Sequence, residues 1–202
     1  KRLYLVKKSG HTSGDEFMVK ELMKEAEGNM KKSIEVVQRE FASLRAGRAT
    51  PALLDKIMVN YYGTPTPVNQ LANISVPEAR LLVIQPWDKG VLHDLEKAIM
   101  KSDLGINPTN DGTVIRLAIP QLTQERRLDL MKVIKKKAEE GRVAIRNIRR
   151  DANDQLKALQ KEGMISEDEL KRSQDDVQKM TDRFIKEVDR ILSVKEQEIM
   201  QV

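Results

Sequence analysis

Hydrophobic residues with a helical period occupy both ends of this chain. In residues 18–46 they recur at alternating steps of four and three, which places them on one face of a helix. They are Met30, Ile34, Val37, Phe41 and Leu44. Gly47 and the pair Thr50-Pro51 follow. We expect the helix to end there, because glycine favours helix ends and proline disfavours helical backbone in the preceding residue.

A longer helical pattern returns between residues 121 and 162 and has the regularity of a heptad. Its predicted inward positions are Met131, Ile134, Ala138, Gly141, Ile145, Ile148, Ala152 and Leu159. Glu162-Gly163 breaks the pattern, and Ser166 with Glu169 forms the S-x-x-E arrangement that starts a helix. The inward positions of this third helix are predicted to be Leu170, Val177, Met180, Phe184, Val188, Ile191 and Val194.

The middle of the chain follows a different pattern and contains all seven prolines, between residues 51 and 120. Short apolar runs predict strands over 57–62, 74–76, 81–85 and 114–119, and one helix is expected over 92–101. Turn residues occupy 107–108 and 110–112.

These patterns predict an α+β protein of two domains. An elongated antiparallel three-helix bundle, formed by 18–47 and 121–202, is interrupted by an inserted small β/α/β domain at 48–120. The chain crosses twice between the domains, and this double crossing either acts as a hinge or is stiff. The predicted hinge residues are Gly47, Arg48, Ala49, Thr50, Pro120 and Gln121.

Residues 1–17 fall outside the helical pattern and are interpreted as an expression scar or a flexible extension, with Met18 as the natural start. The first eight residues are basic around only four apolar residues, and a secretory signal needs an apolar core of about 7–15. The alternative interpretation is a short basic arm that binds nucleic acid.

Composition excludes several kinds of catalytic and metal-binding site. The absence of cysteine excludes disulfides and thiolate metal sites. The two histidines, His11 and His93, are far apart in the sequence. Phosphate-loop, dinucleotide-binding and nucleophile-elbow motifs are missing, and no apolar run reaches the ~18 residues of a membrane span. We therefore expect no enzyme, no cofactor, no metal and no membrane partner.

The net charge of +5 is unevenly distributed. Residues 126–161 carry twelve basic and five acidic residues, whereas 162–202 carry seven and eleven, and 48–121 carry seven of each. The second helix is therefore strongly basic, the third is acidic and the insert is neutral. This distribution favours an anionic partner along the second helix.

Arginines on the second helix are candidate phosphate ligands, because the planar guanidinium binds phosphate in a bidentate way. In the predicted register, Arg142, Arg146 and Arg149 form one exposed stripe, with Arg150 beside it. The alternative is that these arginines pair with the acidic third helix. A second cluster, Arg45 to Arg48, either binds phosphate or simply complements a helix C-terminus.

Five motifs together resemble the bacterial ribosome recycling factor family. They are RAGRATP at 45–51, YYGTPTP at 61–67, KAIMKSDLG at 97–105, RNIRRDAND at 146–154 and the segment 166–176. The resemblance extends from 18 to 202. It implies an L-shaped monomer of transfer-RNA-like outline that acts in the cytoplasm. Such a factor binds the ribosome between its subunits and, with elongation factor G and GTP, splits the post-termination complex and releases mRNA and tRNA.

The same resemblance implies that the bundle contacts RNA of the large ribosomal subunit and that the GTPase acts on the insert. The residues assigned to ribosomal RNA are Arg45, Gly47, Arg48, Arg142, Arg146, Arg149 and Arg150. Two other classes of protein stay open at this point. One is a basic helical RNA-binding adaptor unrelated to translation, and the other is a structural interaction protein whose arginines only pair with the third helix.

Overall fold

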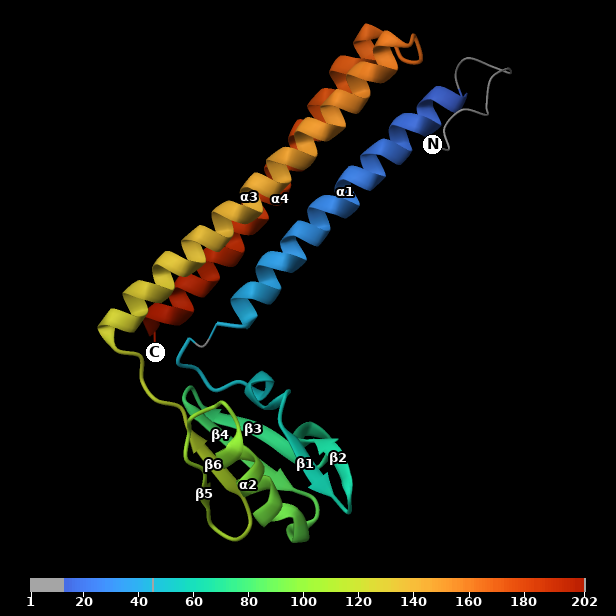
Figure 1. The fold of residues 1–202 in the computed structure, drawn as a ribbon. Coiled ribbons are helices and arrows are strands. Elements are labelled where there is room, and N and C mark those ends of the chain that lie inside the picture. Colours follow the sequence, from blue (N-terminus) through green and yellow to red (C-terminus); the bar gives the residue numbers. More distant parts are fainter. Residues whose placement is uncertain (1–12, 45, 202) are drawn as a thin grey trace. The chain divides into compact units, whose positions relative to one another are not determined.

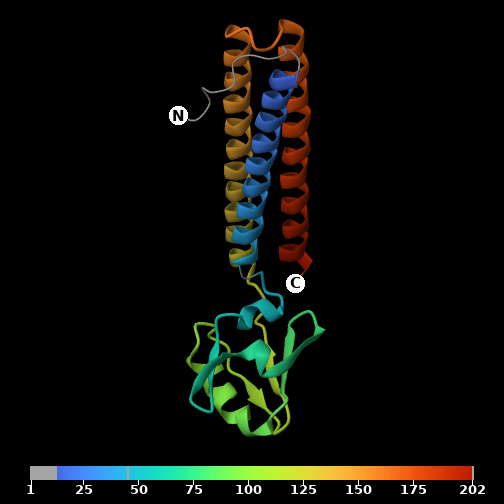
Figure 2. The same ribbon diagram turned by 90° about the vertical axis from the view of Figure 1, so that its right-hand side faces the viewer.

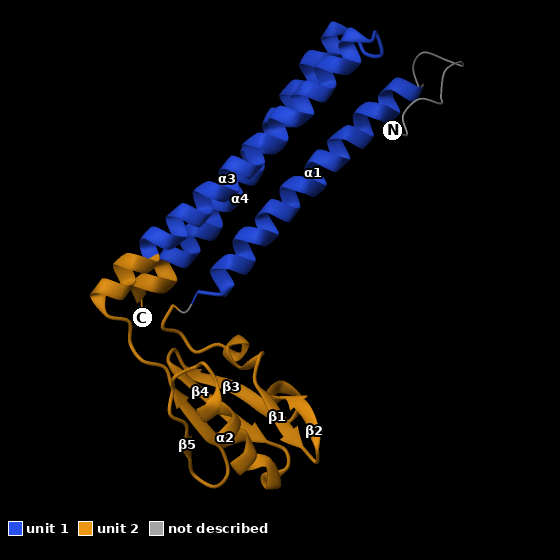
Figure 3. Cartoon of the chain, viewed as in Figure 1, with its two compact units in different colours: residues 1–44, 131–196 blue, residues 45–130, 197–202 orange. Residues whose placement is uncertain are grey.

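The computed structural model describes residues 13–44 and 46–201. The chain forms two compact units (Figure 3). Unit 1 comprises residues 1–44 and 131–196, and unit 2 comprises residues 45–130 and 197–202. The beginning of the second long helix and the end of the third therefore belong to unit 2, about ten residues beyond the predicted domain boundary at 120/121.

Unit 1 is a bundle of three long helices (Figures 1 and 2). They are α1 (Ser13–Ala42), most of α3 (Gln124–Lys161) and most of α4 (Glu167–Gln201). Helix α1 begins at Ser13, so residues 13–17, which the pattern placed in an extension, form its first turn. The remaining residues of that extension, 1–12, lie outside the described residues.

The start of α4 confirms the expected capping box. The Ser166 backbone N–H donates to Glu169 Oε2 at 3.0 Å, and the Glu169 N–H donates to Ser166 Oγ at 3.1 Å. These bonds satisfy two N–H groups that would otherwise lack an intrahelical acceptor.

The bundle core follows most of the predicted faces, and Leu156 and Val194 are two of the exceptions. Leu156 of α3 is fully buried although the heptad skipped it, and Val194 of α4 is 45% exposed although the heptad placed it inward. A straight α-helix has 3.6 residues per turn, so its buried seam drifts away from a strict heptad. The drift brings Leu156 into the seam of α3, and on α4 it favours Ile199, which is fully buried.

Helices α1 and α3 approach closely at Gly141. A Cβ atom built on Gly141 would lie 2.6 Å from Val37 Cγ2 of α1 and 4.0 Å from Val188 Cγ2 of α4. Val37 is itself buried. The absence of a side chain at position 141 therefore sets how closely these two helices can pack.

Unit 2 contains a four-stranded antiparallel sheet in the order β3-β4-β6-β5 and a separate hairpin, β1-β2. The sheet strands are β3 (Ala72–Glu78), β4 (Leu81–Pro86), β5 (Thr109–Asn110) and β6 (Ile115–Ala118). The hairpin strands are β1 (Met58–Tyr61) and β2 (Thr64–Pro67). Helix α2 (Leu92–Lys101) matches the predicted helix.

The core of unit 2 lies between the central strands and α2. Leu82 of β4 pairs with Leu117 of β6, and Ile84 pairs with Ile115 in the same register. These four side chains are fully buried, and they share one core with Leu95 and Ile99 of α2. Burial on alternate residues of β4 and β6 explains why their pattern was recognised as strand.

In the described residues, every helix is too short or too polar to traverse a lipid bilayer.

Candidate nucleic-acid interface

The solvent-facing side of α3 carries a line of cations. Lys132 and Arg150 lie 18 residues apart, which is about five helical turns and places them on the same side of the helix. We call the exposed or half-buried cations on this side, from Lys132 to Arg150, the α3 ridge: Lys132, Lys135, Lys136, Arg146 and Arg150. Within the described part of the chain, Arg146 has the one salt bridge of this group.

Arg142 faces α4 rather than solvent. Its Nη2 pairs with Asp189 Oδ1 of α4 at 2.7 Å, and its Nη1 pairs with Glu139 Oε2 at 3.0 Å. Only 18% of the Arg142 side chain is exposed. The interpretation that arginines of α3 pair with the acidic third helix therefore describes Arg142, which sequence reasoning had assigned to ribosomal RNA.

Glu139 lies within the ridge and joins two of the arginines. It accepts hydrogen bonds from Arg142 and, at 3.2 Å through Oε1, from Arg146 Nη1. These bonds, the one from Arg142 first, lower the pKa of the Glu139 carboxyl. The carboxylate therefore offsets part of the positive charge in the middle of the α3 ridge.

Among the described residues, the hydrogen-bond partners of Arg149 and Arg150 are neutral. Arg149 Nη1 donates to Gln178 Oε1 of α4 at 3.5 Å, and Arg150 Nη1 donates to Asn147 Oδ1 at 3.3 Å. Arg150 is exposed, whereas Arg149 is half-buried beside α4. Of the predicted stripe, Arg142 and Arg149 are thus turned toward α4, whereas Arg146 lies on the α3 ridge with the exposed Arg150, about one position further around the helix.

We expect Arg142→Ala to weaken the bundle and to leave nucleic-acid affinity nearly unchanged. The loss of two partly exposed ion pairs and of packed methylene groups should lower the free energy of unfolding by about 1 kcal/mol. Urea unfolding measures this loss. A double-mutant cycle with Asp189→Ala should show that the two changes are coupled, and additive effects would contradict the pairing.

The second predicted cluster lies in unit 2, and Arg45 falls outside the described residues. Gly47 is buried with a φ of 73°, a left-handed conformation that glycine adopts without strain. The Ala49 N–H donates to the Ala79 carbonyl at 2.8 Å, which ties this segment to the sheet. Arg48 is exposed, so its guanidinium is accessible to an anion.

A cavity of about 340 Å³ in unit 2 brings four of the predicted hinge residues together: Gly47, Arg48, Pro120 and Gln121. Arg126 also lines this cavity and is exposed.

Sequence reasoning did not select Arg126, Lys132 or Lys136 for binding. A helical projection of α3 over steps of 18 residues would have revealed Lys132, because it shares its side with Arg150.

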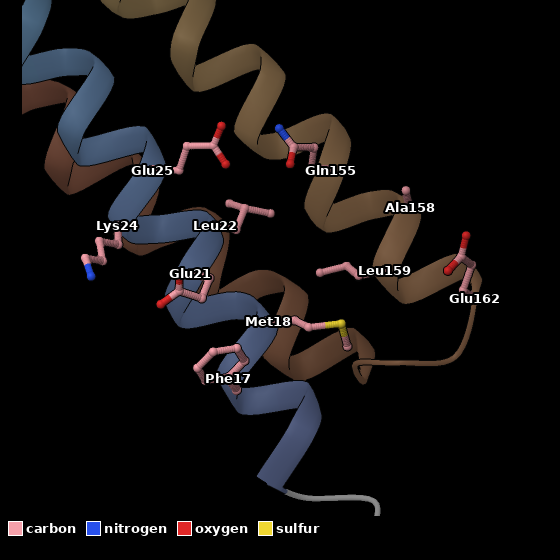
Figure 4. Close-up of a pocket in the computed structure, with 10 residues that line it drawn as sticks. All are labelled: Phe17, Met18, Glu21, Leu22, Lys24, Glu25, Gln155, Ala158, Leu159 and Glu162. Atoms are coloured by element: carbon pink, nitrogen blue, oxygen red, sulfur yellow. The ribbon is translucent and has the colours of Figure 1, made fainter. Parts of the chain in front are cut away.

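A larger groove of about 750 Å³ lies between α1 and α3 in unit 1 (Figure 4). Met18 and Leu22 project from α1 toward Leu159 of α3 (Figure 4). The charged residues that line the groove are Glu21, Glu25, Glu162 and Lys24. The lining is largely apolar and most of its charged residues are acidic, so the groove is unsuited to binding phosphate. The basic side chains of the α3 ridge are therefore the better candidate for the nucleic-acid contact.

The fold and the basic ridge define a helical protein with an inserted sheet unit, of a kind suited to binding nucleic acid along one helix. Comparison with known families is specific. The family model described as "Ribosome recycling factor" matches residues 37–200. The chain belongs to the ribosome recycling factor family.

Individual relatives agree with this assignment. The ribosome-recycling factor of Pelotomaculum thermopropionicum is 81% identical over 185 residues, which are 92% of this chain and 100% of that protein. The corresponding factor of Desulforamulus reducens is 72% identical over the same coverage. A solution structure of the ribosome recycling factor matches with a TM-score of 0.72 and 45% identity, over 91% of this chain and 98% of that one.

A second structural neighbour belongs to a larger assembly. It comes from models of the T. thermophilus ribosome recycling factor and the E. coli elongation factor G bound to the E. coli post-termination complex. The match has a TM-score of 0.62 and 52% identity, and it covers 90% of this chain and 98% of that one.

Proposed function

We propose that this protein recycles ribosomes after termination. It binds the post-termination complex and, together with elongation factor G and GTP, splits it into subunits, so that mRNA and tRNA are released. The observation that carries this proposal is the match to ribosome-recycling factors along their whole length, at up to 81% identity. Because the ribosome is the proposed partner, we expect the protein to act in the cytoplasm.

The α3 ridge is the proposed contact with ribosomal RNA. Phosphate contacts from lysine and arginine fix position and orientation without reading sequence, which suits a factor that must bind every ribosome at the same place. Arg149 is proposed to add to this surface and Arg48 of unit 2 to be a separate contact, since neither has a carboxylate partner among the described residues. Arg142 is proposed to support the surface indirectly, by holding α3 against α4.

Unit 2 is proposed to receive the action of the GTPase. Its inserted segment, 48–121, has no net charge, so it adds little to electrostatic docking on RNA. Gly47, Arg48, Pro120 and Gln121 line one cavity and, with Ala49 and Thr50, are the proposed hinge. Movement at these residues, which lie within unit 2, would let the inserted segment respond to the GTPase while unit 1 stays bound to RNA.

We also infer that the protein breaks no covalent bond itself, and that GTP hydrolysis belongs to its partner. The sequence contains no phosphate-binding loop. On α3 and α4, the carboxylates of Glu139 and Asp189 pair with Arg142 of the bundle. We therefore propose that splitting is driven by binding of this protein to the ribosome and by movement of the GTPase.

Sedimentation of post-termination ribosomes with this protein, elongation factor G and GTP tests the proposal. We expect free subunits only when all three are present, and intact ribosomes when GTP is replaced by a non-hydrolysable analogue. Nucleic-acid binding without splitting would instead support a general RNA-binding adaptor. A protein whose two crossings are fixed by an engineered disulfide should still sediment with ribosomes but should not split them, and splitting by that protein would refute the hinge.

A further inference from the structure

The turn of the β1-β2 hairpin contains a tyrosine where other residues are favoured. Tyr62 and Gly63 connect the two strands, and their φ angles are 49° and 84°. Two positive φ angles in a two-residue hairpin loop correspond to a type I′ turn, for which Asn-Gly is preferred. Among the described residues, Tyr62 is the one non-glycine residue with a positive φ.

Burial does not compensate for this unfavourable backbone, because 82% of Tyr62 is exposed. Its ring lies edge-on to that of Tyr61, with the centroids 4.6 Å apart. Its hydroxyl donates to Asp88 Oδ2 at 3.2 Å. Tyr61 is packed against the core of unit 2, so these two contacts hold an exposed aromatic ring in a defined place on the surface.

Asp88 adds a negative charge beside Tyr62, and the residue before it in the chain is an exposed tryptophan. Trp87, which precedes Asp88, is 69% exposed, and its backbone N–H is fixed by a bond to the Leu71 carbonyl at 3.1 Å. Asp88 Oδ1 accepts from the Gly90 N–H at 2.8 Å. No lysine or arginine of the described residues forms a salt bridge with Asp88.

We propose that Tyr62, Trp87 and Asp88 form a docking surface for a basic segment of a protein partner. In this arrangement a lysine or arginine of the partner lies over the Tyr62 ring and pairs with Asp88. Aromatic faces attract cations, the fixed carboxylate supplies the opposite charge, and exposed tyrosine and tryptophan are the side chains that most often anchor protein interfaces.

An RNA partner is disfavoured by the same charges. Asp88 would repel phosphate, and the inserted segment has as many acidic as basic residues, so no counterion release would favour a nucleic acid here. The inference rests on the proposed function, because the protein partner is one that unit 2 meets within the post-termination complex. It assigns to unit 2 a role separate from the RNA contacts of the α3 ridge.

The competing explanation is that Tyr62 only tethers the hairpin to the segment after β4. Two substitutions separate the explanations. Tyr62→Phe removes the hydroxyl bond to Asp88 and keeps the ring, so it should weaken a tether but largely preserve docking. Tyr62→Asn removes the ring and introduces the residue that the turn prefers, so it should preserve or raise the thermal midpoint while it abolishes docking.

The functional measurement is the rate of subunit splitting with elongation factor G and GTP. We expect Tyr62→Asn to bind ribosomes like the wild type and to split them at least tenfold more slowly. Met100→Ala is the matched control, since Met100 is a large side chain of unit 2 that is 60% exposed but lies on α2. If the wild type splits ribosomes and Tyr62→Asn does so at the same rate, this inference fails while the proposed function stands.

A photo-crosslinking residue in place of Tyr62 identifies the partner, even if Tyr62→Asn does not fold. In the defined complex of post-termination ribosomes, elongation factor G and GTP, the expected adduct resists ribonuclease, is digested by protease and maps to a peptide containing lysine or arginine. An adduct to RNA, or the absence of any adduct while splitting proceeds, would overturn the proposal. Failure of the wild type to split ribosomes would count against the proposed function instead.

Discussion

Gly141→Ala should destabilise the protein, although alanine is the better helix former. The new Cβ would lie 2.6 Å from Val37 Cγ2, and Val37 is a short β-branched residue buried between the helices, so it cannot swing aside. Overpacking of this kind costs about 1–3 kcal/mol, which exceeds the ~1 kcal/mol that alanine gains over glycine in a helix interior. We expect a lower midpoint in urea unfolding and a longer separation of α1 from α3.

Two controls isolate the close approach as the cause. Gly28→Ala is matched, because Gly28 also lies inside a helix but has no atom within 4 Å of its would-be Cβ. That substitution should raise stability by up to ~1 kcal/mol. In the second control, Val37→Ala combined with Gly141→Ala should recover much of the loss, because the clashing methyl group is gone. An unfolding midpoint that is unchanged in Gly141→Ala would contradict the close approach.

Loss of two ridge arginines should produce the largest effect on function. We expect Arg146→Ala with Arg150→Ala to weaken ribosome binding roughly ten- to hundredfold at moderate salt, since each solvent-exposed contact between opposite charges contributes up to about 1 kcal/mol. The slope of log affinity against log salt should fall by about two, one for each phosphate that the protein no longer neutralises. Filter binding or pelleting with ribosomes over a series of salt concentrations measures both quantities.

A change of net charge alone could also weaken binding, so the control removes the same charge elsewhere. Arg183 and Arg190 are exposed on α4 and pair with Glu27 and Glu187. Replacing both by alanine should leave the salt slope unchanged, because neither residue belongs to the α3 ridge. If the two double variants lose affinity equally, the effect is one of overall charge and the ridge is not the contact surface.

Periodicity predicted the long helices because apolar side chains on one face have to be buried together. The capping box at Ser166 was equally readable, since its two bonds depend on residues three positions apart. Local pattern did not predict β2, because its two prolines argue against a strand. Residues 64–67 nevertheless form a strand, because Pro65 and Pro67 alternate with the residues whose backbone groups face β1.

The candidate interface was predicted less completely than the fold. The sequence located the arginines on α3 but left open whether they face RNA or α4. Side-chain geometry distinguishes them individually: Arg142 is held by Asp189, whereas the partner of Arg150 among the described residues is the neutral Asn147. A heptad assigns each residue to an approximate face, and a displacement of one position around the helix is enough to exchange an arginine paired with a carboxylate for one that is not.

The prolines of β2 have a consequence for behaviour at high concentration. Pro65 and Pro67 pair with Asn60 and Met58 of β1, and neither proline has an N–H group. On the side of β2 away from β1, these positions therefore offer no donor to another strand, and proline at such an edge opposes edge-to-edge aggregation. The β2 edge of the hairpin that presents an exposed aromatic ring to solvent is thereby protected from pairing with a second copy of the chain.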